Sequence, residues 1–143
     1  MKKMTRRKFM DLSVVSISAL FLSPIVGFFF PKKLEEVPSV PQPVGTPEEL
    51  PVGASKTIPF GRYPALVINT EDGLKAYSAV CTHFACLVKW DEENGEIACP
   101  CHEGYFNVGD GSVKSGPPPR GLDVFHAYIN DEDGVIYVEA EES

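Results

Sequence analysis

The pattern of apolar and polar positions first separates a long uncharged segment from the rest of the chain. Residues 12–31 form a run of twenty residues without a charge, and 20–30 shows no polar face. A helix of twenty residues is about 30 Å long, close to the hydrocarbon thickness of a bilayer. A buried core helix is the alternative, but it would place polar residues at a period of 3.6. We therefore predict one N-terminal transmembrane helix over 12–31.

The residues before this segment are basic. Five of the first eight residues are Lys or Arg, and Thr5-Arg6-Arg7-Lys8-Phe9-Met10 resembles a twin-arginine export signal, which carries folded proteins across a membrane. No small-x-small cleavage site follows the apolar run, so we expect the anchor to be retained. The positive-inside rule then places residues 1–11 in the cytoplasm as signal and tail, and the rest of the chain on the extracytoplasmic side.

Prolines dominate the next part of the chain. Six of the thirteen prolines fall between Pro31 and Pro51, a density that helices and central strands do not tolerate. We predict that residues 32–55 form an extended, semi-rigid hinge of about 3 Å per residue between the anchor and a head domain.

From residue 56 to the C-terminus the pattern is that of short strands. Runs of β-branched and aromatic residues alternate with turn signals such as Asn94-Gly95, and helical periodicity is absent after residue 34. This predicts an all-β domain over 56–143, an antiparallel β-sandwich or open barrel. The expected strands are Ala65–Asn69, Leu74–Val80, Leu87–Trp90, Glu96–Cys99, Leu122–Asn130 and Val135–Ala140.

Charge follows the same division. Residues 1–33 carry a net charge of +6 and residues 34–143 a net charge of −13, within a formal total of −7. An acidic head argues against nucleic acid as a partner, because phosphate binding requires clustered Lys and Arg.

Two short clusters contain all four cysteines and two of the three histidines. They are Cys81-Thr82-His83-Phe84-Ala85-Cys86 and Cys99-Pro100-Cys101-His102-Glu103-Gly104. Each offers a thiolate and an imidazole within two or three residues, plus one further Cys. Two metal centres fit two thiolates and two imidazoles: a closed tetrahedral zinc site, or a [2Fe–2S] cluster of the Rieske type. The ligand count alone does not separate them.

The two clusters together, C-T-H-x-x-C and C-P-C-H, resemble the Rieske iron–sulfur subunit of cytochrome bc-type quinol–cytochrome c oxidoreductases. The resemblance extends over the export signal, anchor, hinge and β head, and implies an all-β Rieske fold with a small cluster-binding subdomain. It implies that Cys81 and Cys99 bind one iron of a single [2Fe–2S] cluster, and that His83 and His102 bind the solvent-facing iron. It also implies a disulfide between Cys86 and Cys101, which soluble Rieske ferredoxins lack.

The resemblance implies a function as well. Such a subunit takes an electron and a proton from quinol through His83 or His102 and passes the electron to a c-type cytochrome. Its implied partners are a cytochrome b subunit and a c-type cytochrome, in a dimeric multi-subunit complex of the cytoplasmic membrane. Family members that oxidise ubiquinol carry Ser and Tyr hydroxyls where this chain has Gly104 and Phe106. Their loss predicts a low potential for the class, suited to menaquinol.

A third loop and two isolated residues complete the set of candidates. Gly116, Pro117, Pro118 and Pro119, in loop 116–120, are expected to cover the cluster. His126 and Trp90 lie on expected strands without ligand-like neighbours, so we interpret both as structural.

Two rival functions remain at this stage. The small Rieske subunit of arsenite oxidase shares the export signal and can share the disulfide, but relays electrons from molybdenum. A zinc-stabilised, anchored binding module without redox activity belongs to a different class.

Overall fold

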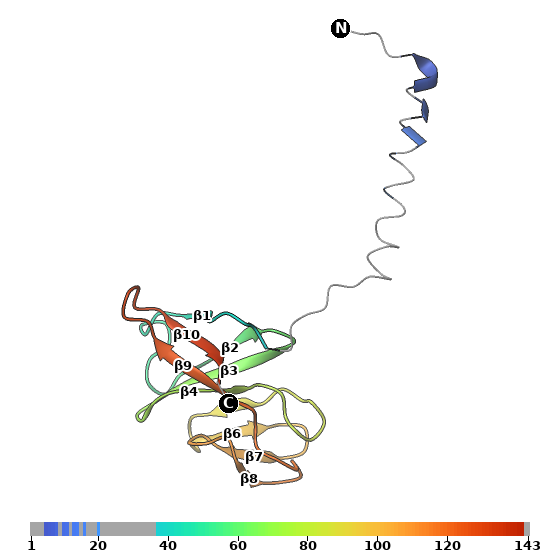
Figure 1. The fold of residues 1–143 in the computed structure, drawn as a ribbon. Helices are drawn as coiled ribbons and strands as arrows, with labels where there is room; N and C mark the ends of the chain where they lie inside the picture. Colours follow the sequence, from blue (N-terminus) through green and yellow to red (C-terminus); the bar gives the residue numbers. More distant parts are fainter. Residues whose placement is uncertain are drawn as a thin grey trace. The chain divides into compact units, whose positions relative to one another are not determined.

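The computed structural model describes residues 5–8, 10–11, 13–14, 16, 20 and 37–141 (Figure 1). The chain forms two units, 1–33 and 34–143. The described residues of the first unit, from position 6 onward, are helical. Among the described residues, none of the helical segments is long and apolar enough to cross a membrane. Most of the predicted anchor over 12–31 lies outside the described residues.

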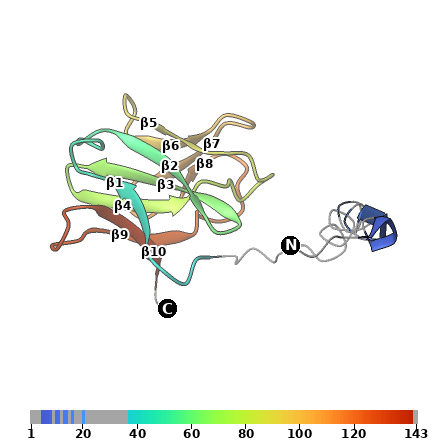
Figure 2. The ribbon, with the colours of Figure 1, turned by 90° about the horizontal axis from the view of Figure 1, so that it is seen from above.

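The second unit is a head whose described residues, 37–141, form ten strands in two antiparallel sheets, which Figures 1 and 2 show as separate layers. Within residues 37–141 it contains no helix, as the sequence pattern predicts. The larger sheet has the order β1 (Gln42–Gly45), β10 (Ile136–Ala140), β9 (Val124–Ile129), β4 (Gly73–Ser78), β3 (Tyr63–Thr70) and β2 (Ser55–Phe60). The smaller sheet has the order β5 (Lys89–Asp91), β6 (Glu96–Cys99), β7 (Gly104–Asn107) and β8 (Val113–Ser115).

The first strand corrects the predicted domain boundary. Gln42–Gly45 pairs antiparallel with β10, although it lies inside the segment 32–55 that the proline density assigned to a hinge. Edge strands tolerate proline because one side of the backbone needs no ladder partner. The β head therefore begins before residue 56, and any hinge must end before β1.

Strands β3 and β4 are buried on both faces, and this double burial organises the head. Ala65 and Val67 face one hydrophobic cluster, whereas Leu66 and Ile68, which alternate with them, face another. Side chains that alternate along a strand point to opposite faces of its sheet. A strand covered on both sides therefore needs an uninterrupted apolar run, and residues 65–68 provide it.

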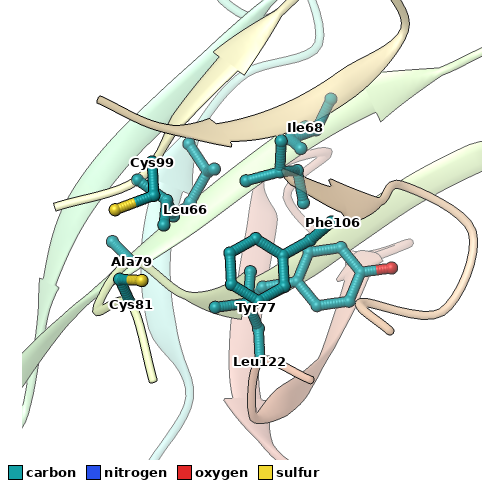
Figure 3. Packing of buried hydrophobic residues seen from close by; sticks show 10 residues of the cluster. Leu66, Ile68, Tyr77, Ala79, Cys81, Cys99, Phe106 and Leu122 are labelled. Atoms are coloured by element: carbon teal, nitrogen blue, oxygen red, sulfur yellow. The ribbon is translucent and has the colours of Figure 1, made fainter. Parts of the chain in front are cut away.

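The two clusters have different roles. The first packs on one face of the larger sheet and is made of Val44, Leu50, Ile58, Phe60, Ala65, Val67, Ala76, Ile136 and Val138. The second joins the two sheets and is made of Leu66, Ile68, Tyr77, Ala79, Cys81, Val88, Ile97, Cys99, Phe106 and Leu122 (Figure 3). We call this second cluster the inter-sheet core. Two of its members are the cysteines expected to bind a metal.

Partly buried hydrogen bonds reinforce the contact between the sheets. The Tyr77 hydroxyl donates to the carbonyl oxygen of Val108 at 2.7 Å, so a side chain of β4 binds the backbone that follows β7. The Trp90 indole donates to the carbonyl oxygen of Gly53 at 2.7 Å, which ties β5 to the segment before β2. Trp90 thus has the structural role expected from the sequence.

Replacing Tyr77 by Phe tests the first of these bonds. The side chain is 1% exposed, and Tyr77→Phe removes one hydrogen bond while keeping the ring. We expect the free energy of unfolding of the full-length protein to fall by about 1 kcal/mol at neutral pH. Urea unfolding followed by fluorescence measures this, and an unchanged midpoint would contradict the assigned bond.

The stabilities of the wild type and Tyr77→Phe should also depend differently on pH. Burial raises the pKa of Tyr77 to about 12, above the value of about 10 for a tyrosine in the unfolded chain. The unfolded state therefore ionises first, and wild-type stability from this group falls as pH rises from about 10 towards 12. Tyr77→Phe lacks that group, so its deficit relative to the wild type should shrink over this range. A deficit that stays constant from pH 8 to pH 11 would contradict the buried, neutral tyrosine.

Candidate metal centre

The first cysteine cluster forms a closed loop at the end of β4. An isolated β-bridge joins Val80 to Leu87, and the loop 81–86 lies between them. The amide of Cys81 donates to the carbonyl oxygen of Cys86 at 2.8 Å, and the amide of Ala85 donates to that of Cys81 at 3.1 Å. These bonds turn the chain back on itself within six residues.

The second cluster forms the turn between β6 and β7. Cys99 and Gly104 are partners in the antiparallel register of these strands, so residues 100–103 form the connecting turn. The pattern of burial along β7 places Gly104 and Phe106 on the buried face and Tyr105 on the other. Tyr105 therefore points away from the face that holds Phe106.

A disulfide links the two loops. Cys86 and Cys101 are bonded, with an S–S distance of 2.09 Å and a Cα–Cα distance of 6.5 Å. This confirms the pairing that the resemblance implied. Because each loop contributes one half of the bond, the disulfide fixes one loop against the other.

The two remaining cysteines are free thiols at the edge of the inter-sheet core. Cys81 and Cys99 are each 3% exposed, and Figure 3 shows both sulfur atoms on the same side of this core. Burial raises the pKa of the Cys81 thiol, and the neighbouring Cys99 raises this pKa too, although the backbone amide of His83 opposes the shift. Two adjacent thiolates in such a site require a compensating positive charge, which a metal ion provides.

The two expected histidines face each other across the loops. The rings of His83 and His102 meet edge to face with centroids 4.9 Å apart. The ring of Phe84 contacts both, at 4.3 Å from His83 and 5.7 Å from His102. Within the described part of the chain, His83 Nδ1 is the buried side-chain nitrogen or oxygen atom that lacks a hydrogen-bond partner. A buried polar atom without a partner requires an explanation, and a metal ligand is one.

The disulfide reduces the number of cysteine thiolates that could bind a metal. The sulfurs of Cys86, Cys99 and Cys101 lie within 4.8 Å of one another, but two of these residues form the disulfide and offer no thiolate. The sulfur and imidazole donors left in the two loops are the thiols of Cys81 and Cys99 and the rings of His83 and His102. Two sulfur and two nitrogen donors, with an unpartnered buried Nδ1 among them, fit the ligand set of a Rieske cluster.

The proline loop packs against the second cysteine loop. Gly116 has φ +95°, and a Cβ there would lie 2.5 Å from the carbonyl oxygen of Glu103 and 2.8 Å from Gly104 Cα. A Cβ on Gly104 would lie 2.8 Å from the ring of Pro118, which is buried. This close packing therefore requires glycine at positions 104 and 116.

Sequence reasoning missed several residues that position these loops. The hydroxyl of Thr82 donates to the carbonyl oxygen of Arg120 at 2.6 Å, which ties the first loop to the end of the proline loop. Ala85 and Glu103 have positive φ values of 55° and 52°. No local sequence signal marks these roles, since the Thr82 bond spans 38 residues and left-handed backbone usually calls for glycine.

The third histidine, His126, does not lie in the two cysteine loops. It lies on β9, with Nδ1 3.0 Å from a carboxylate oxygen of Glu139.

Comparison with known proteins places this geometry in a family. Residues 40–126 match the family described as "Rieske [2Fe-2S] domain". The chain is 39% identical over 128 residues to the cytochrome b6-f complex iron-sulfur subunit of Chlorobaculum tepidum, a match that covers 88% of this chain and 67% of that protein. It is 35% identical over 126 residues to the subunit of the same name from Chlorobaculum thiosulfatiphilum, covering 87% and 67%.

Solved structures share the fold. The cyanobacterial plasma membrane Rieske protein PetC3 from Synechocystis PCC 6803 is 29% identical, with a TM-score of 0.61 over 71% of this chain and 100% of that chain. The ferredoxin of carbazole 1,9a-dioxygenase from Nocardioides aromaticivorans IC177 has the same TM-score at 24% identity, over 72% and 100%, and is similar in fold. The family match removes the zinc-stabilised module from the alternatives. This chain belongs to the Rieske family and carries a Rieske [2Fe–2S] domain of the kind found in the iron–sulfur subunits of cytochrome bc-type complexes.

Proposed function

We propose that this protein is the electron-transfer subunit of a membrane quinol–cytochrome c reductase. The observation that carries the proposal is that two neighbouring buried thiols and two facing imidazoles lie on loops joined by a disulfide. The relatives in Chlorobaculum, named as subunits of cytochrome b6-f complexes, support this reading. In it, the head accepts one electron at a time from quinol at a cytochrome b subunit and delivers it to a c-type cytochrome.

The four donors take distinct positions in this proposal. Cys81 and Cys99, at the edge of the inter-sheet core, hold the buried iron, and His83 and His102, which are more accessible, hold the outer iron. A Rieske cluster supplies a one-electron acceptor with a potential of about −150 to +300 mV, high because neutral imidazoles replace two thiolates. The disulfide and the Thr82–Arg120 bond keep the donors in place, and the loop 116–120 covers the second loop.

The histidines also provide for the proton. The side chain of His102 is exposed and that of His83 is half-buried. An imidazole that binds metal through one nitrogen can use the other as a proton site. We propose that this second nitrogen accepts a hydrogen bond from a quinol hydroxyl and holds the proton that leaves with the electron.

The rest of the chain fits a mobile subunit of a membrane complex. We propose that 12–31 is a single transmembrane anchor, preceded by a twin-arginine-type signal in 1–11, with the head on the extracytoplasmic side. The linker of this proposal begins at residue 32 and ends before β1 at Gln42. A tether of this kind lets the head reach an electron donor and an acceptor in turn, within a dimeric complex.

Two positions on the buried face of β7 support a low potential. Hydrogen bonds to the sulfurs of a cluster favour its reduced state and raise its potential. Gly104 has no side chain, and Phe106, which is 0% exposed, has no hydroxyl. We propose menaquinol as the electron donor, because it is a stronger reductant than ubiquinol and matches a lower potential.

Phe106→Tyr tests this tuning directly. Figure 3 shows the ring of Phe106 directed toward the side of the inter-sheet core where Cys81 and Cys99 lie. A hydroxyl there that donates to a sulfur should raise the midpoint potential by about 20–60 mV, which corresponds to one hydrogen bond of about 0.5–1.5 kcal/mol. An EPR-monitored redox titration measures the shift. Tyr105→Phe, on the opposite face of β7, is the matched control and should leave the potential unchanged.

Ligand substitutions test the donor set. Cys99→Ser and His102→Ala should each abolish the EPR signal of the reduced cluster below g = 2 and the stoichiometric iron and acid-labile sulfide. His126→Ala, which changes the histidine paired with Glu139 on β9, should retain all three. A wild-type protein that is colourless and loaded with zinc would contradict the proposal.

The native complex decides the physiological reaction. Purified through a tag on this chain, it should contain b-type haem and oxidise a menaquinol analogue with reduction of a c-type cytochrome. A complex that contains molybdenum and no haem b would contradict this function and support the arsenite oxidase alternative.

A further inference from the structure

Over the described part of the head, two residues other than glycine adopt the left-handed backbone conformation. Ala85 has φ 55° and Glu103 has φ 52°, and each lies in one of the two loops that carry the metal donors. This conformation is unfavourable for an L-residue because its Cβ crowds a backbone carbonyl, whereas glycine adopts it freely. Each loop therefore keeps a side chain at a position where glycine would relieve strain.

The surrounding structure holds Glu103 in this conformation. The backbone of Gly116 approaches so closely that a Cβ there would lie 2.5 Å from the carbonyl oxygen of Glu103. The next residue, Gly104, is in similarly close contact with the ring of Pro118. Strained backbone persists where neighbours determine it fully, and such sites concentrate where a protein works.

Contacts of the Glu103 side chain do not offset the strain of its backbone. It is exposed, and among residues 37–141 it forms no hydrogen bond or ion pair. Lys114 and Arg120, two cations of the neighbouring β8 and proline loop, pair instead with Glu96 and Asp123. The carboxylate of Glu103 thus remains an uncompensated negative charge.

This charge stands next to a proposed metal ligand. Glu103 directly follows His102, whose ring meets that of His83 at 4.9 Å. Consecutive Cα atoms lie about 3.8 Å apart, so the Glu103 side chain begins one residue from this ligand, and the Debye length at physiological ionic strength is about 8 Å. Screening by salt therefore reduces the interaction between the carboxylate and the metal centre without removing it.

We infer that Glu103 is a tuning residue whose fixed negative charge lowers the midpoint potential of the centre held by His83 and His102. The inference rests on the proposed function, because it requires a redox-active cluster at these donors. An electron added to the centre is repelled by a nearby anion, so the reduced state is disfavoured. Glu103 would then act in the same direction as the missing hydroxyls at 104 and 106.

Three variants of the full-length, cluster-loaded protein separate charge from backbone strain. Glu103→Gln removes the charge and keeps a side chain of the same size, Glu103→Gly removes both the charge and the strain, and Ala85→Gly removes strain alone. EPR-monitored redox titrations at pH 7, at low and high salt, give the potential. Urea unfolding of the same samples gives the stability.

The midpoint potential and the urea stability should respond to different variants. E103Q and E103G should raise the midpoint potential by similar amounts, with a smaller rise at high salt, and A85G should leave the potential unchanged. E103G and A85G should unfold at higher urea concentrations than the wild type, and E103Q at the wild-type concentration.

Two outcomes would overturn the inference while the proposed function stands. One is a normal Rieske EPR signal in E103Q with the wild-type potential. The other is a rise in A85G equal to that in E103G, which would assign the effect to the backbone. If the wild type itself shows no Rieske signal, both the inference and the proposed function fail.

Discussion

The burial of β3 and β4 on both faces is the constraint on which the rest of the head depends. One face of these strands closes the core of the larger sheet, and the other packs against the smaller sheet. Cys81 and Cys99 belong to the second contact, so the packing that joins the two sheets also positions the two thiols. A polar substitution at Leu66 or Ile68 would therefore disturb the metal centre as well as the fold.

Around this core, the metal loops are held by a few contacts between segments distant in sequence. The disulfide fixes one loop to the other, Thr82 binds the end of the proline loop, and Gly116 lies against the backbone of Glu103. Loops without regular structure become precise only when several such restraints act together. The same restraints hold the strained backbone of Glu103. They therefore also keep its negative charge next to the proposed ligand His102.

The sequence was most informative where chemistry or patterning is local. The family resemblance carried by the two Cys/His clusters implies the disulfide that the structure contains, and the strand Glu96–Cys99 is predicted with its observed bounds. The strand at 42–45 was missed because proline content outweighs a four-residue pattern, and its pairing with β10 is a long-range property. The left-handed backbone of Glu103 also depends on a contact distant in sequence. Gly116 packs against residue 103, and glutamate by itself disfavours this conformation, so the local sequence does not predict it.

The central claim is that two cysteine sulfurs and two histidine nitrogens of these loops hold one [2Fe–2S] cluster. Pulsed EPR of the reduced full-length protein tests this most directly, because it detects nitrogen nuclei bound to the paramagnetic centre. We expect two strongly coupled nitrogens in the wild-type protein. A reduced cluster that shows no strongly coupled nitrogen, as expected for ligation by four cysteines, would contradict it.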